Sequence, residues 1–406
     1  MPRLLASLLA ISLLAAGCGD DDSAVEPSPS DSSTTTTAVT TTTAEPATTT
    51  TAAVALPEID LLGRGEYQVG VATVTVLDEE RDRPLTADVW FPLADDVSGD
   101  AHRYTFITGD YYESPLAVSA DAAAVSAKGP FPFVVYSHGS GGVRFIHSDY
   151  TETLASHGYI VVAPDHTGNT AVEQITGTAD ASALIALNRP LDVSLVIDAF
   201  LEPSNDVTAP FQPAIDGERI AVTGHSFGGF TTYATIAGYD NDLGSAAADQ
   251  RIDALVALAP AVGSGGADSL LSDDDLGRVE VPALVIVGTD DKTTPIDPNV
   301  TRAWDVTNSS PHYRLELIAG EHQSFTDLCA YLDSFDQLEA PTAIVVETIE
   351  AQAVEGCSPG DMASDRVQDL TNTFAVTFLD SVFRDAEMFT PESFAIPGDV
   401  NYLAKE

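Results

Sequence analysis

Mostly apolar runs alternate with longer polar segments through most of the chain. Runs without strict polar alternation are typical of strands buried on both faces, as in a parallel sheet. Helical spacing of apolar positions predicts helices at residues 191–201 and 367–383, and two early strands, 67–76 and 85–91, are expected to pair antiparallel at one edge of the sheet. The pattern predicts an α/β fold, with a mostly parallel central sheet flanked by helices. The expected inner strands are residues 131–137, 160–163, 220–223, 254–258, 282–288 and 313–318.

The run at residues 220–223 leads directly into Gly224-His225-Ser226-Phe227-Gly228-Gly229. A Gly-x-Ser-x-Gly pattern between a strand and a helix is typical of a nucleophile elbow, where the small flanking residues avoid collision with neighbouring backbone. Residues 230–237, closed by Gly238, can form the helix that follows. We therefore predict that Ser226 is a catalytic nucleophile. The alternative is an ordinary strand-turn-helix with an inert serine.

In such an elbow arrangement the acid and the base follow the serine in sequence, each on a loop after a later strand. The strand at 282–288 runs into Asp290 and Asp291, and we favour Asp291 as the acid. The next strand leads to His322, the candidate base, which would take the proton of Ser226 while Asp291 orients its ring. Six other histidines are not favoured as the base. His102, His147, His157 and His166 precede the nucleophile and are assigned surface or packing roles, His225 inside the elbow is expected to pack or make a supporting hydrogen bond, and His312 is expected at the opposite edge of the sheet.

Attack of Ser226 on an ester carbonyl would form an oxyanion, which needs fixed hydrogen-bond donors. One expected donor is the amide of Phe227, at the start of the helix, where backbone N–H groups have no partner within the helix. The second is expected from the loop at 138–142, which follows the strand at 131–137. We predict the backbone amides of Ser140 and Phe227 as the oxyanion hole.

Three segments carry a resemblance to a known family: residues 131–144, 154–163 and 224–229. They resemble the platelet-activating-factor acetylhydrolase and dienelactone-hydrolase-like branch of the α/β hydrolases, and the likeness extends over about residues 60–385. The resemblance implies an α/β-hydrolase fold. The short interval between 258 and 282 leaves no room for a large cap domain there, so we expect an open cleft.

The resemblance also carries over to single residues. The amides after the His-Gly pair and after the serine donate to the oxyanion in that branch, which corresponds to Ser140 and Phe227. Asp291 and His322 match the acid and base loops of the family. The chain departs from dienelactone hydrolases, which carry a cysteine nucleophile, and from related polyester hydrolases, which place a tryptophan where residues 259–262 have no aromatic.

The amino terminus is typical of an export signal. Residues 1–18 contain Arg3, a short apolar core and the sequence Ala15-Ala16-Gly17-Cys18, which resembles a bacterial lipobox. The apolar core is too short to remain as a membrane span. We expect lipidation of Cys18 and anchoring at a bacterial membrane surface; the alternative is ordinary cleavage and secretion with Cys18 free.

The segment after the signal lacks any apolar period. Residues 19–56 are acidic and then threonine-rich, which predicts a disordered linker. Residues 57–406 are expected to form one catalytic domain. Two cysteines remain there, Cys329 and Cys357, and an even pair in an exported protein predicts a disulfide after the His322 loop. Two separate buried thiols are the alternative.

The charge of the chain excludes some partners. Lysine plus arginine number 17 and aspartate plus glutamate number 62, so the formal net charge is −45. Such a field repels phosphates, which argues against nucleic-acid binding and disfavours anionic substrates. The acidic turn Ser272-Asp273-Asp274-Asp275 could bind calcium, but we favour a solvated turn and expect no metal and no cofactor.

These observations favour a membrane-tethered serine esterase. We expect a monomer that acts on small-molecule or lipid esters with short or oxidised acyl chains, including phospholipid-type esters. Two alternatives remain: a polyester or cutinase-like hydrolase, and a surface binding lipoprotein that uses a hydrolase scaffold without catalysis.

Overall fold

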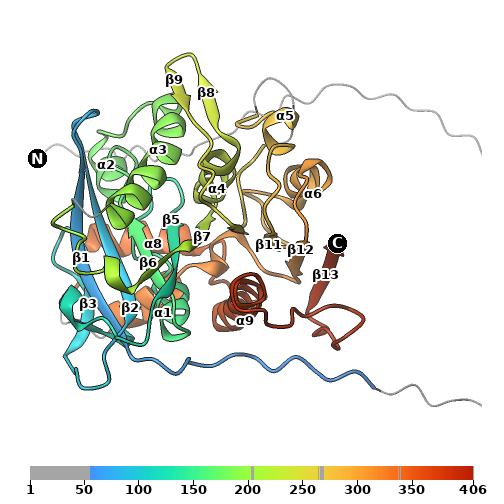
Figure 1. Cartoon of the computed structure of the whole chain (residues 1–406), viewed down its shortest axis with the longest axis horizontal. Helices are drawn as coiled ribbons and strands as arrows, with labels where there is room; N and C mark the ends of the chain where they lie inside the picture. Colours follow the sequence, from blue (N-terminus) through green and yellow to red (C-terminus); the bar gives the residue numbers. More distant parts are fainter. Residues whose placement is uncertain are drawn as a thin grey trace, which may run out of the picture. The chain divides into compact units, whose positions relative to one another are not determined.

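The computed structural model describes residues 55–405, apart from 203–204, 264, 266–268, 337 and 339. The predicted signal, Cys18 and all but the last two residues of the predicted linker lie outside the described residues. In the described part, eleven strands form one mixed sheet in the order β13-β12-β11-β10-β7-β5-β6-β2-β1-β4-β3 (Figure 1). Two short strands, β8 and β9, form a separate hairpin.

The central strands agree closely with the apolar runs. They pair parallel with one another from β6 through β5, β7, β10 and β11 to β12. The strands are β1 (Val69–Asp78), β2 (Arg83–Pro92), β3 (Ala101–Thr105), β4 (Tyr111–Ser119), β5 (Phe131–Ser137), β6 (Ile160–Pro164), β7 (Ile215–His225), β8 (Tyr239–Asn241), β9 (Gly244–Ala246), β10 (Ala254–Leu258), β11 (Ala283–Gly288), β12 (His312–Leu317) and β13 (Val400–Lys405).

Helices cover both faces of the sheet, as the pattern predicts (Figure 1). Alternate residues of β5 enter two different cores: Val134 and Tyr136 belong to the core with α1 and α9, whereas Phe133 and Val135 belong to the core with α3 and α4. The helices are α1 (Ser148–Ser156), α2 (Ala171–Thr176), α3 (Ser182–Leu201), α4 (Phe227–Ala237), α5 (Asp273–Leu276), α6 (Thr301–Val306), α7 (Leu328–Phe335), α8 (Ala343–Ala353) and α9 (Ser364–Phe383). The fold is the predicted α/β-hydrolase arrangement.

The edges of the sheet differ from the prediction. β1 and β2 pair antiparallel as expected, but they are not at the edge, because β1 also pairs with β4, and β3 follows. At the other end, β13 pairs antiparallel with β12. The edge strands β3 and β13 mix exposed and buried positions, so their sequences lack the continuous apolar run of a central strand. The helix before the elbow strand starts earlier than predicted, at Ser182, and contains Pro190.

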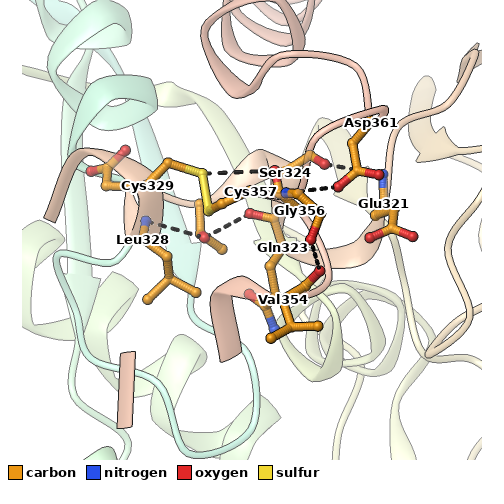
Figure 2. Close-up of a disulfide and its surroundings, with 12 residues drawn as sticks. Glu321, Gln323, Ser324, Leu328, Cys329, Val354, Gly356, Cys357 and Asp361 are labelled. Carbon is orange, nitrogen blue, oxygen red and sulfur yellow. Dashed lines mark hydrogen bonds between the residues drawn. A yellow bond between two sulfur atoms is a disulfide. The ribbon is translucent and has the colours of Figure 1, made fainter. Parts of the chain in front are cut away.

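The predicted disulfide is present. Cys329 in α7 and Cys357 after α8 are bonded, with their Cα atoms 5.7 Å apart. Figure 2 shows the bond beside Gln323 and Ser324, on the loop that follows the candidate base. Within the described part of the chain, none of the helices has the length and apolar character required to cross a bilayer.

A buried polar cluster lies between α3 and the strands. Asp192 accepts two hydrogen bonds from Arg83, each 2.9 Å, and its carboxylate lies 3.0 Å from Nδ1 of His166. Burial, assisted by the positive charge of Arg189, lowers the pKa of His166 to about 3. The imidazole is therefore neutral in the folded protein near neutral pH.

We expect loss of the disulfide to destabilise the fold. The bond joins residues separated by 28 positions, and closing a loop of that length in the unfolded chain is worth about 3 to 4 kcal/mol. The double substitution Cys329→Ser and Cys357→Ser should lower the free energy of unfolding by about that amount, measured by guanidinium titration. Catalytic activity at low temperature should change less than stability. An unchanged unfolding midpoint would contradict the expectation.

Acid should destabilise the protein through buried histidine. Because the folded-state pKa of His166, about 3, lies below the ordinary value of about 6.5, the unfolded chain binds more protons between these pH values. The contribution of neutral His166 to stability is complete above about pH 6.5 and is lost progressively as the pH falls towards about 3. Guanidinium titrations at about pH 7 and about pH 4.5 should show the decrease, and His166→Gln should show a smaller one. Equal decreases in both proteins would argue against this assignment.

Candidate active site

Ser226 occupies a strained turn between β7 and α4. Its backbone has φ 57° and ψ −118°, outside the conformations that non-glycine residues usually adopt. The flanking glycines are required by space: a Cβ on Gly228 would lie 1.8 Å from the carbonyl oxygen of Ser137, and one on Gly224 would lie 2.5 Å from the carbonyl oxygen of Gly228. The geometry is that of a nucleophile elbow.

The structure brings Asp291 and His322 together. Oδ2 of Asp291 lies 2.8 Å from Nδ1 of His322, so the ring donates from Nδ1 and Nε2 can accept a proton. The other carboxylate oxygen accepts the amides of Thr293 and Thr294. Burial raises the pKa of Asp291, but the hydrogen bond and charge of His322 and the bonds from Thr294 outweigh it, and the net pKa is lowered. Asp290, the alternative acid, is exposed.

His225 connects the elbow to the base. Its Nε2 donates to the carbonyl oxygen of His322 at 2.9 Å, and the two ring centroids are 4.7 Å apart. Burial lowers the pKa of His225 well below its usual value, so this ring is neutral. The residue before Ser226 therefore contacts the candidate base directly. The approach of the Ser226 hydroxyl to Nε2 of His322 stays a prediction.

A glutamate that the sequence did not single out joins the acid loop to the base loop. The carboxylate of Glu355 accepts the amide of Lys292 at 3.0 Å and the hydroxyl of Thr293 at 2.8 Å. Its carbonyl oxygen accepts the amide of Gln323, which follows His322. Because Glu355 precedes the disulfide residue Cys357, the end of α8 is attached to both loops. No local motif marks Glu355, because its partners are about 30 to 60 residues away in sequence.

The predicted oxyanion loop lies against the elbow. A Cβ on Gly139 would be 3.4 Å from Cβ of Ser226. The amide of Gly141 donates to the carbonyl of Asn169 and that of Gly142 to the carbonyl of Gly139, both at 3.2 Å. These bonds leave the amide of Ser140 as the donor that we expect for an oxyanion. Phe227 is the first residue of α4, in the position predicted for the second donor.

A second residue that the sequence did not reveal is Arg189 of α3, which is fully buried. Its guanidinium donates to the carbonyl oxygens of His138 and Gly139, the latter at 3.0 Å. It also donates to Ser137 Oγ at 3.1 Å and to the side-chain oxygen of Asn169. In addition, it lies 5.4 Å from the ring centroid of Phe227. One buried cation therefore contacts both segments of the predicted oxyanion hole.

The acidic turn at 272–275 forms internal contacts. Ser272 caps the short helix α5 by accepting the amide of Asp275. Asp273 pairs with Arg302 at 2.8 Å, and Asp275 pairs with Arg278. Among the residues that the structure describes, no group of three or more histidine, cysteine, aspartate or glutamate side chains is arranged to hold a metal ion.

Comparison with known proteins agrees with this architecture. Residues 104–188 match the family described as platelet-activating factor acetylhydrolase, isoform II. The chain is 26% identical over 166 residues to platelet-activating factor acetylhydrolase of Bos taurus, a match that covers 32% of this chain and 37% of the relative. It is 30% identical over 137 residues to the enzyme of the same name from Canis lupus familiaris, which covers 25% of this chain and 31% of the relative. The matches thus span about a third of each relative's length.

A solved structure extends the similarity in fold to most of the chain. The ferulic acid esterase from Streptomyces cinnamoneus superposes with a TM-score of 0.61 at 21% sequence identity, covering 86% of this chain and all of that protein. At this level of identity the match concerns the fold alone. Taken with the order of the strands, the comparisons show that the chain has an α/β-hydrolase fold and that part of it is similar to platelet-activating factor acetylhydrolases.

Proposed function

We propose that the protein is a serine carboxylic ester hydrolase that works through an acyl-enzyme. The observation that carries this proposal is the buried Asp291–His322 pair, 2.8 Å apart, next to an elbow that presents Ser226. Both side chains are at most 3% exposed, which strengthens their interaction relative to one in water. Similarity to proteins named as an acetylhydrolase and an esterase supports the same reaction class.

The proposed mechanism follows from the hydrogen bonds. Nε2 of His322 takes the proton of Ser226 as its oxygen attacks the ester carbonyl, and Asp291 stabilises the imidazolium that forms. The amides of Ser140 and Phe227 stabilise the oxyanion. His322 then protonates the leaving alcohol, and water activated by the same ring hydrolyses the acyl-enzyme.

We propose esters of short or oxidised acyl chains, including phospholipid-type esters, as the substrate class. The names of the relatives support acetyl esters, and the name of the structural neighbour supports esters of an aromatic acid. The net charge of −45 disfavours anionic substrates. Lipid anchoring through Cys18 and a monomeric state stay predictions.

The function is tested with p-nitrophenyl acetate and the purified protein. Wild-type protein should release p-nitrophenol, and Ser226→Ala should lower kcat by about 10⁴-fold or more, because the nucleophile is lost. Substitution of a surface serine, Ser98→Ala, provides the control. Equal rates for wild type and Ser226→Ala would exclude the proposed nucleophile, and a protein inert towards every ester would favour the binding-lipoprotein alternative.

The choice of acid is tested by two adjacent substitutions. Asp291→Asn should lower kcat by about 10⁴-fold, since an amide cannot stabilise the imidazolium or hold the ring in the required tautomer. Asp290→Asn should leave kcat within about twofold, because its side chain is exposed. Steady-state kinetics of the two variants on the same ester distinguish the carboxylates, and the opposite ranking would assign the role to Asp290.

Arg189 should act on the reaction through the oxyanion loop. A lysine at this position keeps the charge but cannot reproduce the forked set of hydrogen bonds, so Arg189→Lys should lower kcat by about 10²-fold with a smaller change in KM. Arg83→Lys is the matched control, because Arg83 is buried in the adjoining cluster but bonds Asp192 rather than the oxyanion loop. That control should lower stability without the loss in kcat. Equal kinetic losses in both variants would indicate a general structural role for Arg189.

A further inference from the structure

A cavity of about 260 Å³ lies beside the predicted oxyanion loop. Its walls come from residues 105–107 at the end of β3, residues 141–146 after β5, Asp165 after β6, residues 170–175 at and within α2, and the pair α7 and α8. The wall is mainly apolar. Its apolar members include Phe106, Phe145, Ile175, Leu328, Tyr331 and Ile349.

The walls of the cavity are continuous in sequence with two loops of the candidate active site. Gly141 and Gly142 directly follow Ser140, and Leu328 begins α7 six residues after His322. Hydrogen bonds join the segment after the oxyanion loop to the segment after the base loop. The hydroxyl of Tyr331 donates to the carbonyl of Phe145 at 2.6 Å. The amide of Asp327 also donates to the carbonyl of Ile146 at 2.9 Å. A group held in the cavity is thus in contact with extensions of both the oxyanion loop and the base loop.

The charged groups in the wall are paired with one another. Arg144 Nη1 lies 2.7 Å from Asp165, and its Nε lies 2.9 Å from Asp88. The guanidinium also lies 5.4 Å from the ring centroid of Phe145. An ionic ligand group would have to break these pairs and would lose its hydration without a new partner. The wall therefore favours an uncharged group over a phosphate or an ammonium.

The size of the cavity limits the group that it can hold. An apolar cavity of about 150 Å³ is large enough to bind benzene. The present cavity is larger than that, with room for one aromatic ring and a short chain, or for a short alkyl chain alone. The disulfide supports one wall, because it ties Cys329, next to Leu328, to the segment after α8 (Figure 2).

We propose that this cavity binds an uncharged, apolar moiety of the ester, either an aromatic ring or a short alkyl chain, while the ester carbonyl lies at Ser226. The proposal deepens the proposed function and rests on it for the position of the scissile bond. It assigns the apolar part of the substrate to the cavity and leaves any charged headgroup outside it.

Two substrate series test the proposal and locate the apolar group in the ester. The first varies the acyl part: ethyl acetate, ethyl butyrate and ethyl benzoate. The second varies the alcohol: ethyl, butyl and benzyl acetate. In wild-type protein kcat/KM should rise along one series, by about fourfold for each buried methylene, and the series that rises identifies the occupant as acyl or alcohol.

Substitutions that fill the cavity provide the specific test. Thr348→Trp on α8 and Ile175→Trp on α2 enter the cavity from different walls at partly exposed positions. Each should abolish the rise along the responsive series, because the added indole occupies the volume that the apolar group would take. Glu347→Trp is the matched control, since Glu347 is an exposed neighbour on α8 that does not line the cavity, and it should preserve the rise.

A binding measurement separates this proposal from the proposed function. Benzyl alcohol should bind the Ser226→Ala protein, detected by ligand-observed NMR, and lose that binding when Thr348→Trp or Ile175→Trp is added. Circular dichroism checks that each variant is folded. If benzyl alcohol binds but the wild-type protein hydrolyses no ester, the proposed esterase function is wrong and the cavity assignment still holds. Binding unaffected by both tryptophans, or flat kinetics in both series, would overturn the cavity assignment.

Discussion

The close approach of the elbow to strand β5 is the constraint on which the candidate site depends. Gly228 lies so near the carbonyl of Ser137 that no side chain fits between them, and Ser226 adopts a backbone conformation that costs about 1 to 3 kcal/mol. Neighbouring strands hold this strained residue: its amide donates to Leu258 at 2.9 Å, and its carbonyl accepts the amide of Ala261 at 3.0 Å. Strand β5 and the end of β10 therefore hold Ser226 from two sides. The loops that carry Ser140, Asp291 and His322 can then be arranged around a serine of fixed position.

Strands alone do not fix the loop that faces the elbow, and Arg189 supplies the missing support. Removing a guanidinium from water is costly unless hydrogen bonds replace its hydration, and here carbonyl, hydroxyl and amide oxygens do so. Two of those oxygens belong to His138 and Gly139. Because these carbonyls accept hydrogen bonds from Arg189, the groups that replace the hydration of this buried cation also fix the path of the loop before Ser140.

The sequence predicted the features that depend on local pattern. Continuous apolar runs located the parallel strands, and the elbow followed from glycines that sterics require. The sequence also favoured Asp291 over Asp290 as the partner of the candidate base, and in the structure Asp291 accepts a hydrogen bond from His322. The edge strands β3 and β13 escaped prediction, because exposure on one side removes the apolar run. Arg189 and Glu355 escaped it for another reason: each contacts partners far away in sequence, and neither position carries a local motif.

Glu355 shows how stability and site geometry are coupled in this fold. The α7–α8 segment leaves the sheet after the base loop and returns through the disulfide, so that Glu355 reaches back to the amides beside Asp291 and His322. The same segment forms one wall of the apolar cavity. Acid loop, base loop and cavity wall are therefore parts of one connected unit. A displacement of α8 would therefore change both the cavity wall and, through Glu355, the contacts that position the loops of Asp291 and His322.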